Sequence, residues 1–313
     1  MGHAVSVVDD RPGESVAFRS LAKLGYWVVD TQIERHAKNV VSLITEGCYD
    51  RVIYVGGMSF CFTVEQFRMI REATEARFTA FLWDSFENCQ RFANCLDLFD
   101  EVLSFDPVDC ERCGLHFRPL FYDERYSLVP LEPDGGFIYD ACFVGSVHQV
   151  TKYEAVLGIC EGLKERGMSV YTHFYMPSRS SEIFRKITRR SYRKSAFTND
   201  SLTVEGVASV YGKSKAVIDS PQSGQCGLTM RTLEVLGSNR KLITTNGDIV
   251  NYDFYDPANI FVSIGGSVPP SSFFEEGYRS LPGNVVDSYS IRGFCEALID
   301  LGERNIEYRK ASS

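Results

Sequence analysis

The sequence predicts an α/β protein of two domains, each built on a parallel sheet, that face each other across a cleft. Short apolar runs alternate with helical patterns twice along the chain, and this alternation is typical of parallel α/β domains. A stretch rich in proline, glycine and charge, residues 122–136, separates the two series. The length of 313 residues also suits two such domains better than one.

The first series predicts a domain at residues 1–128. Its expected strands are β-branched or aromatic runs, and the expected helices carry apolar residues at helical spacing. The strands are predicted at Ala4–Val8, Tyr26–Val29, Arg51–Val55, Thr79–Trp83 and Glu101–Phe105. The helices are predicted at residues 14–24, 32–45 and 64–77.

The second series predicts a domain at residues 129–290. A last segment, residues 291–313, contains a helix that can return to the first domain. The strands are predicted at Tyr139–Val144, Ser169–Thr172, Lys215–Asp219 and Lys241–Thr245. The helices are predicted at residues 152–166, 204–211 and 228–236.

Composition excludes several classes of protein. A net charge of −8 argues against a nucleic-acid partner, which would require a basic surface. Neither a signal peptide nor a run of eighteen apolar residues is found, so we expect a cytoplasmic protein whose ten scattered cysteines are reduced and mostly buried. The CxxC at Cys110 and Cys113 has no companion pair at zinc spacing, and no metal site is predicted.

The stretch from Lys215 to Thr245 contains the strongest candidate for a binding site. It predicts strand, polar loop, helix and strand, which is a crossover unit of a parallel sheet. Ligands of such sheets bind beyond the carboxyl ends of the strands. Arg231 and Glu234 are three residues apart on the predicted helix and therefore share a face. Arginine can donate hydrogen bonds to phosphate, and glutamate can accept them from sugar hydroxyls. The pair therefore suggests a nucleotide-sugar site.

Further donor-binding residues follow from the same reasoning. Gly145 and Ser146 lie between a strand and a helix, where backbone can approach phosphate, and Lys152 can add charge there; a solvated helix face is the alternative for Lys152 and for Glu234. His148 is a lone histidine, either a phosphate or sugar contact or a plain loop residue. The residues expected to line the sugar and the diphosphate are Gln225, Gly227, Leu228 and Thr229.

The first domain is expected to bind the acceptor. Asp84 and Asp106 each follow an apolar strand, so either can be the general base that takes a proton from the acceptor hydroxyl. Aromatic residues flank Asp84 and suit a sugar ring. The alternative for Asp106 is a structural one, in which it caps a helix that begins at Pro107.

One basic run stands out in this acidic chain. Residues 185–194 carry six positive charges, and at helical spacing three arginines fall on one face. The run can meet an anionic membrane or a lipid-linked acceptor, which would place the protein peripherally at the inner membrane face, or it is a solvated helix.

Several segments are informative together: Phe81-Leu82-Trp83-Asp84-Ser85, Leu103 to Cys110, Phe143 to His148 with Lys152-Tyr153-Glu154, Gln225 to Glu234, and Tyr252-Asp253-Phe254-Tyr255. They resemble the CgeB-like and capsular or O-antigen polysaccharide glycosyltransferases, which have the GT-B fold of two Rossmann-like domains. The resemblance covers about residues 50 to 260. Many retaining GT-B enzymes carry a glutamate eight residues before the one that matches Glu234, and here that position is Cys226.

The resemblance implies a metal-independent, hexosyltransferase-like enzyme with no cofactor. It would move a sugar from a nucleotide donor, a UDP-sugar by our guess, to a glycan or lipid-linked acceptor in surface polysaccharide synthesis. One alternative is a nucleotide-sugar-binding module without catalysis. Another is an NAD-dependent enzyme, which the absence of a GxGxxG after a strand makes weaker.

Overall fold

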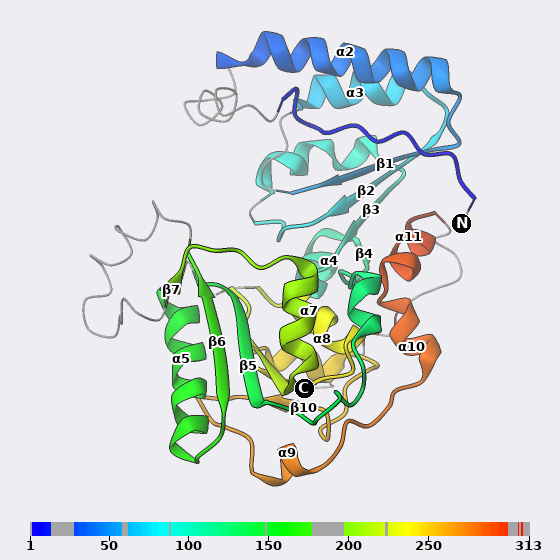
Figure 1. The fold of residues 1–313 in the computed structure, drawn as a ribbon. Coiled ribbons are helices and arrows are strands. Elements are labelled where there is room, and N and C mark those ends of the chain that lie inside the picture. The colour runs from blue at the N-terminus through cyan, green and yellow to red at the C-terminus, as the bar shows by residue number, and fades with distance from the viewer. Residues whose placement is uncertain are drawn as a thin grey trace. The chain divides into compact units, whose positions relative to one another are not determined.

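The computed structural model describes residues 2–13, 28–57, 62–87, 89–147, 149–176, 197–222, 225–299, 306 and 308. The chain divides between Arg118 and Pro119 into two compact units, called unit 1 and unit 2 below (Figure 1). Every pair of neighbouring strands in both units is parallel among the residues described. The predicted α/β class with two parallel-sheet domains is therefore confirmed.

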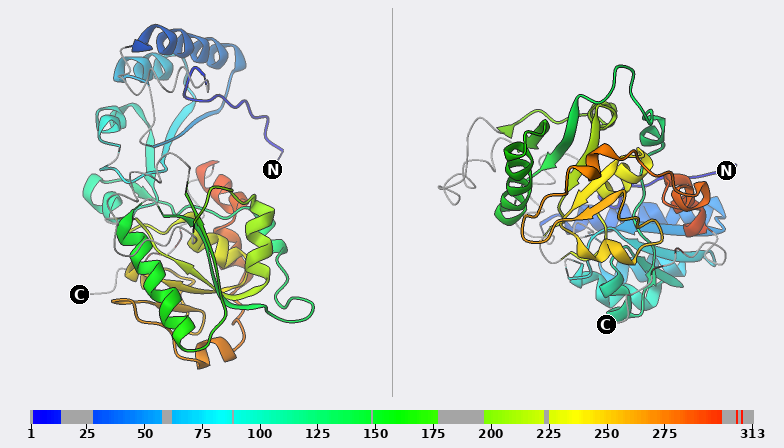
Figure 2. Two further views of the ribbon diagram at one scale, coloured as in Figure 1. Left: turned by 60° about the vertical axis from the view of Figure 1, so that its left-hand side comes forward. Right: turned by 90° about the horizontal axis from the view of Figure 1, so that it is seen from below.

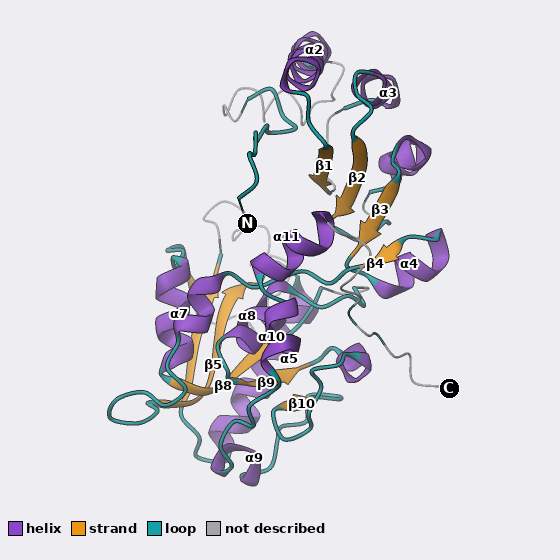
Figure 3. Cartoon of the chain, turned by 90° about the vertical axis from the view of Figure 1, so that its right-hand side faces the viewer, coloured by secondary structure: helices purple, strands orange, loops and turns teal. Residues whose placement is uncertain are grey.

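Unit 1 has a four-stranded sheet in the order β1-β2-β3-β4. Its core forms where Phe78 and Leu82 of β2 pack with Ile33 of α2 and Phe67 of α3, and Figures 1 and 3 show α2 and α3 together on one face of the sheet. Thr63 and Gln66 form a capping box that starts α3. The elements are α2 (Asp30–Gly47), β1 (Arg51–Gly56), α3 (Val64–Glu72), β2 (Arg77–Leu82), η2 (Gln90–Leu98), β3 (Glu101–Ser104), α4 (Pro107–Cys113) and β4 (His116–Phe117).

The predicted first strand, Ala4–Val8, is wrong. The segment has no regular structure and pairs with no strand of the described chain. Val5 and Val7 are 75% and 89% exposed. β-branched residues favour extended backbone, but a strand also requires hydrogen-bonding neighbours, and the sequence of one segment does not supply them.

Two other predictions near the start of the chain need correction. Of the expected strand Tyr26–Val29, the described part leads directly into α2, where the Val29 carbonyl accepts the first helical hydrogen bonds. The helix predicted at 64–77 ends at Glu72, because Arg77 already begins β2. The helix predicted at residues 14–24 lies outside the described residues.

Unit 2 has a six-stranded sheet in the order β10-β9-β8-β5-β6-β7. Helix α5 covers one face of this sheet, and α7 and α8 cover the other (Figure 2). The core on the α5 face includes Phe143, Tyr153, Phe174 and Ile218, all at most 2% exposed. The strands are β5 (Tyr139–Ser146), β6 (Val170–Tyr175), β7 (Phe197–Thr198), β8 (Ser214–Asp219), β9 (Lys241–Thr244) and β10 (Ile260–Val262). The helices are η3 (Glu124–Leu128), α5 (Val150–Glu165), α7 (Val204–Gly212), α8 (Met230–Gly237), η5 (Gly247–Asn251), α9 (Ser272–Glu275), α10 (Gly283–Ser288) and α11 (Ile291–Ile299).

The segment that begins unit 2 forms hydrogen bonds and an aromatic contact with residues 289–294 of the same unit. Tyr122 donates its amide to the Tyr289 carbonyl over 2.9 Å and accepts the Ile291 amide over 2.9 Å. Phe121 packs on Phe294 of α11, with ring centroids 4.6 Å apart. The first residues of the predicted linker are thus built into unit 2.

Candidate functional site

The strand order of unit 2 changes direction between β5 and β8, and the region beyond the carboxyl ends of these two strands is called the crevice below. These strands are neighbours although β6 and β7 lie between them in sequence. From β5 the chain passes through α5 to β6 on one side, and from β8 it passes through α8 to β9 on the other. The two following loops therefore diverge at the carboxyl edge, which is where open α/β sheets bind their ligands.

Asp219, the last residue of β8, organises this crevice. Its side chain is fully buried, and one carboxylate oxygen accepts hydrogen bonds from the hydroxyls of Thr229 (2.6 Å) and Thr232 (2.8 Å). Thr229 is also the N-cap of α8 and accepts the Thr232 amide. Asp219 thus ties both ends of the loop 220–228 together. No functional role was predicted for it, although an acidic residue that ends the apolar run of β8 was a usable signal.

Arg231 occupies the second position of α8 and pairs with Asp219 over 3.0 Å. Its guanidinium lies over the Phe143 ring, 5.1 Å from the centroid, and a Cβ at Gly145 would clash with it. Burial alone would raise the pKa of Asp219, but Arg231 and Lys152 bring that pKa below its ordinary value. The Arg231 Nε is buried and has no hydrogen-bond partner in the described chain.

Lys152 adds a second cation from the first turn of α5. Burial and the neighbouring Arg231 lower the pKa of Lys152 to about 8, and Asp219 opposes this shift. A lowered lysine pKa means that the positive charge is incompletely compensated at this place. An anion bound here would compensate it.

Glu234 lies one turn beyond Arg231 on the same face of α8. Its carboxylate is 3.5 Å from the Tyr211 hydroxyl and also accepts a hydrogen bond from Tyr126. Burial raises the pKa of Glu234, while Arg231 and Tyr126 act in the opposite direction. Glu234 is therefore a partly buried carboxylate with hydrogen-bond partners, and it does not belong to a solvated helix face. Neither tyrosine was predicted for the site.

The other predicted donor residues take varied positions. Gln225 donates to the Gly227 carbonyl over 3.0 Å, so the two shape the loop together. Leu228 is 1% exposed, and its side chain belongs to the core. Ser146 ends β5 and is half-buried. His148 lies outside the described residues. The structure thus brings Gly145, Lys152, Thr229, Arg231 and Glu234 together at one edge of the sheet.

In unit 1, Asp84 and Asp106 differ in their surroundings. Asp84 follows β2 and is half-buried, with its carboxylate so close to Gly57 that a Cβ there would clash. Asp106 is 3% exposed and accepts the amides of Val108 (3.0 Å) and Asp109 (3.4 Å). The Asp106 side chain thus caps α4, which is the structural alternative predicted above.

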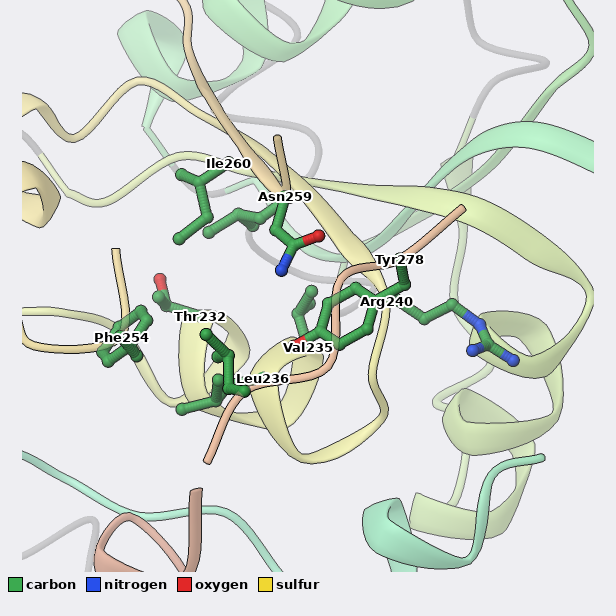
Figure 4. Close-up of a pocket in the computed structure, with 10 residues that line it drawn as sticks. Thr232, Val235, Leu236, Arg240, Phe254, Asn259, Ile260 and Tyr278 are labelled. Carbon is green, nitrogen blue, oxygen red and sulfur yellow. The ribbon is translucent and has the colours of Figure 1, made fainter. Parts of the chain in front are cut away.

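A small apolar cavity lies beneath α8, away from the crevice. Its volume of ≈ 10 Å³ leaves room for about one water molecule, which is too little for a nucleotide. Figure 4 shows the Arg240 guanidinium pointing away from this cavity. The residues drawn and labelled there are Thr232, Val235, Leu236, Arg240, Phe254, Asn259, Ile260 and Tyr278.

Two features are absent from the described residues. No three histidine, cysteine or carboxylate side chains in this part of the chain gather closely enough to hold a metal ion. None of the helices described has both the length and the apolar character needed to span a bilayer. The basic run at 185–194 lies outside the described residues, so its helical face stays a prediction.

Comparisons with known proteins identify the fold. No protein-family model matches the sequence, and no curated protein matches it. Among solved structures, a glycosyltransferase from Rickettsia africae is similar, with a TM-score of 0.56 at 10% identity over 85% of this chain and 79% of that one. The lipopolysaccharide outer core galactosyltransferase WaaB gives 0.50 at 14% identity over 87% and 80%. An alpha-glucosyltransferase in complex with UDP and DNA gives 0.50 at 11% identity over 85% and 74%.

These neighbours are GT-B glycosyltransferases, with two Rossmann-like domains. At such identities the likeness speaks for the fold alone. It agrees with the two units of this chain, each built on a parallel sheet. The chain has the two-domain α/β fold of the GT-B glycosyltransferases.

Proposed function

We propose that this protein is a metal-independent glycosyltransferase. It moves a sugar, in our view a hexose, from a nucleotide-sugar donor to a glycan or lipid-linked acceptor in surface polysaccharide synthesis. The observation that carries the proposal is the pair of cations, Arg231 and Lys152, at the crevice between β5 and β8, with Glu234 one turn along α8. The resemblance to CgeB-like enzymes supports a polysaccharide acceptor, as does the similarity to WaaB, a lipopolysaccharide outer core galactosyltransferase.

Each residue has a chemical task in this proposal. Negative charge grows on the leaving diphosphate, and Arg231 and Lys152 at two helix starts are placed to stabilise it. The unpartnered Arg231 Nε offers a donor that Asp219 does not use. Glu234 accepts the hydroxyls of the nucleotide ribose. In unit 1, Asp84 is our first candidate for the base that deprotonates the acceptor; Asp106 comes second, since it already caps a helix.

The nucleotide is the part of the proposal that is simplest to test. We favour UDP as the carrier, and UDP is bound in one of the similar structures. A panel of nucleotides, UDP-sugars and NAD is titrated into the protein by calorimetry, with and without a chelator. Binding of UDP or a UDP-sugar that survives the chelator supports the donor site. Binding of NAD alone would contradict the proposal. Binding of a nucleotide sugar without transfer to any glycan would indicate a binding module.

Glu234→Ala tests the ribose contact. Loss of a hydrogen bond to a charged group costs about 1.5–3 kcal/mol, so affinity for UDP should fall roughly ten- to a hundredfold. Calorimetric titration measures it, beside a melting curve to verify folding. Glu161→Ala, a change of an exposed carboxylate elsewhere in the same unit, is the control and should bind as the parent does. Unchanged UDP affinity in a folded Glu234→Ala protein would place the ribose elsewhere.

Lys152→Met should weaken the binding of UDP and increase the stability of the fold. Because the folded protein holds Lys152 at a lowered pKa, removing the cation should stabilise the fold by about 1–3 kcal/mol below pH 8. The gain should vanish as pH rises from about 8 toward the ordinary lysine value of about 10.4. UDP affinity should fall about tenfold, since an ion contact to phosphate is lost.

The matched control for this change is Lys164→Met, which removes an exposed lysine from the same helix. Denaturant unfolding at pH 7 and pH 10, together with UDP titration, measures both effects. A Lys152→Met protein that is less stable than the parent at pH 7 would contradict the assignment of Lys152 as an uncompensated cation.

A further inference from the structure

Two tyrosines that the proposed chemistry has not used converge on Glu234. Tyr211 comes from the last turn of α7, and its hydroxyl is 3.5 Å from Glu234 Oε2. Tyr126 comes from η3 and hydrogen-bonds the same carboxylate. The two rings lie 5.8 Å apart, and the residues are 0% and 3% exposed. Buried phenols need a hydrogen-bond partner, and Glu234 supplies one to both.

The protonation states fit donation from the phenols to a carboxylate. Burial and the charge of Glu234 raise the pKa of Tyr126 and of Tyr211 well above the ordinary value, so both keep their protons. The groups that face Glu234 are Arg231 on its own helix, Asp219 at the end of β8, and the two tyrosines. Arg231 and the phenols favour the ionised carboxylate, whereas burial and Asp219 oppose it.

Two carboxylate oxygens offer about four acceptor positions. The two phenols use two of these positions, leave the others for a ligand, and restrict the rotation of the carboxylate. A carboxylate held in one orientation binds a ribose diol without first losing rotational freedom. A glutamate that turned freely, or that took up a proton near neutral pH, would do this less well.

The segment that carries Tyr126 is itself anchored. Asp123 accepts the Arg125 amide to begin η3, and Arg125 reaches Glu205 on α7 over 2.6 Å. The segment directly after Arg118 is thereby fixed to the helix that bears Tyr211. A stretch that looked like a linker from its prolines and glycines supplies part of the site.

We infer that Tyr126 and Tyr211 are positioning residues, which hold Glu234 ionised and correctly oriented for the ribose of a nucleotide. The inference rests on the proposed donor site. It extends that site to η3 and α7, neither of which was predicted to take part.

The test uses Tyr126→Phe and Tyr211→Phe, which remove only the hydroxyls. The control is Tyr139→Phe at the other end of β5, where the ring packs at a tilt against Tyr171. The Glu234 carboxyl is followed by carbon-13 NMR from pH 4 to pH 9, and its signal is identified by its loss in Glu234→Gln. Each site variant should raise the titration midpoint by about one pH unit or more, because a hydrogen bond to the charged form is lost. The control should leave the midpoint unchanged.

UDP affinity is measured over the same pH range. It should decline toward acid pH as Glu234 gains a proton, and in the two variants the decline should begin at a higher pH. If both variants fold, bind UDP and keep the parent midpoint, the inference is overturned and the donor site stands. If the midpoint moves but neither parent nor variants bind any nucleotide, the tyrosines do hold Glu234 and the proposed function is what fails. If Tyr211→Phe does not fold, Tyr126→Phe decides alone.

Discussion

Arg231→Met is expected to destabilise unit 2 by about 3–5 kcal/mol, because it leaves the fully buried Asp219 without its charged partner. The loss should depend on pH. In the parent the pKa of Asp219 lies below its ordinary value, so the pair contributes stability above that value and loses it as pH falls. The variant instead raises that pKa, so the difference from the parent should be smallest near pH 4 and grow toward neutrality.

Denaturant unfolding at pH 4.5 and pH 7.5 measures this difference. The sharper comparison is the double variant Arg231→Met with Asp219→Asn, in which neither charge of this ion pair is left without the other and both threonine hydroxyls retain an acceptor. It should recover much of the stability lost in Arg231→Met. Equal stability of the single variant and the parent at pH 7.5 would show that the ion pair is not what holds this end of the sheet. UDP should bind neither variant as it binds the parent.

Arg240→Met is expected to cost about 3–5 kcal/mol for a different reason. Arg240 is 3% exposed. Within the described chain its guanidinium donates hydrogen bonds to backbone carbonyls and not to a carboxylate. It joins three segments: the loop at 130–131, the end of α7, and the turn after α8. The substitution leaves several of these carbonyls buried and without a donor.

Arg240→Lys should recover only part of the stability, since an ammonium has three donors on one atom and cannot span the three segments. The control is Arg292→Met, because Arg292 is exposed and its pair with Glu124 spans 3.6 Å. That change should be within about 0.5 kcal/mol of the parent. Urea unfolding measures all three variants, and an Arg240→Met protein within about 1 kcal/mol of the parent would refute the prediction.

Local pattern was sufficient for most of the elements and for part of the candidate site. Arg231 and Glu234 could be placed on one face of a helix because a helical spacing of three residues needs no knowledge of the rest of the fold. The strand β8 was found because a short β-branched run between turn residues has few other readings. Thr229 was expected to line the sugar, yet its hydroxyl caps α8 and binds Asp219.

The missed residues depend on contacts that are distant in sequence. Tyr126 and Tyr211 meet Glu234 only because η3 and α7 pack against α8. The crevice itself depends on β8 pairing with β5 rather than with β7, and no single segment encodes that choice. Ala4–Val8 is the converse case, where a suitable local pattern finds no partner strand among the described residues.

The hydrogen bonds of Tyr122 with Tyr289 and Ile291 have a consequence for folding during synthesis on the ribosome. They join the first residues of unit 2 to nearly the last, and such contacts form late because a long loop must close first. A ribosome adds only about 5–20 residues each second. Many seconds therefore pass between the synthesis of Tyr122 and that of the residues around Tyr289. During that time Tyr122 and Phe121 are without the aromatic and backbone neighbours that later cover them. A chain that stopped before Tyr289 would leave Tyr122 and Phe121 without these neighbours permanently.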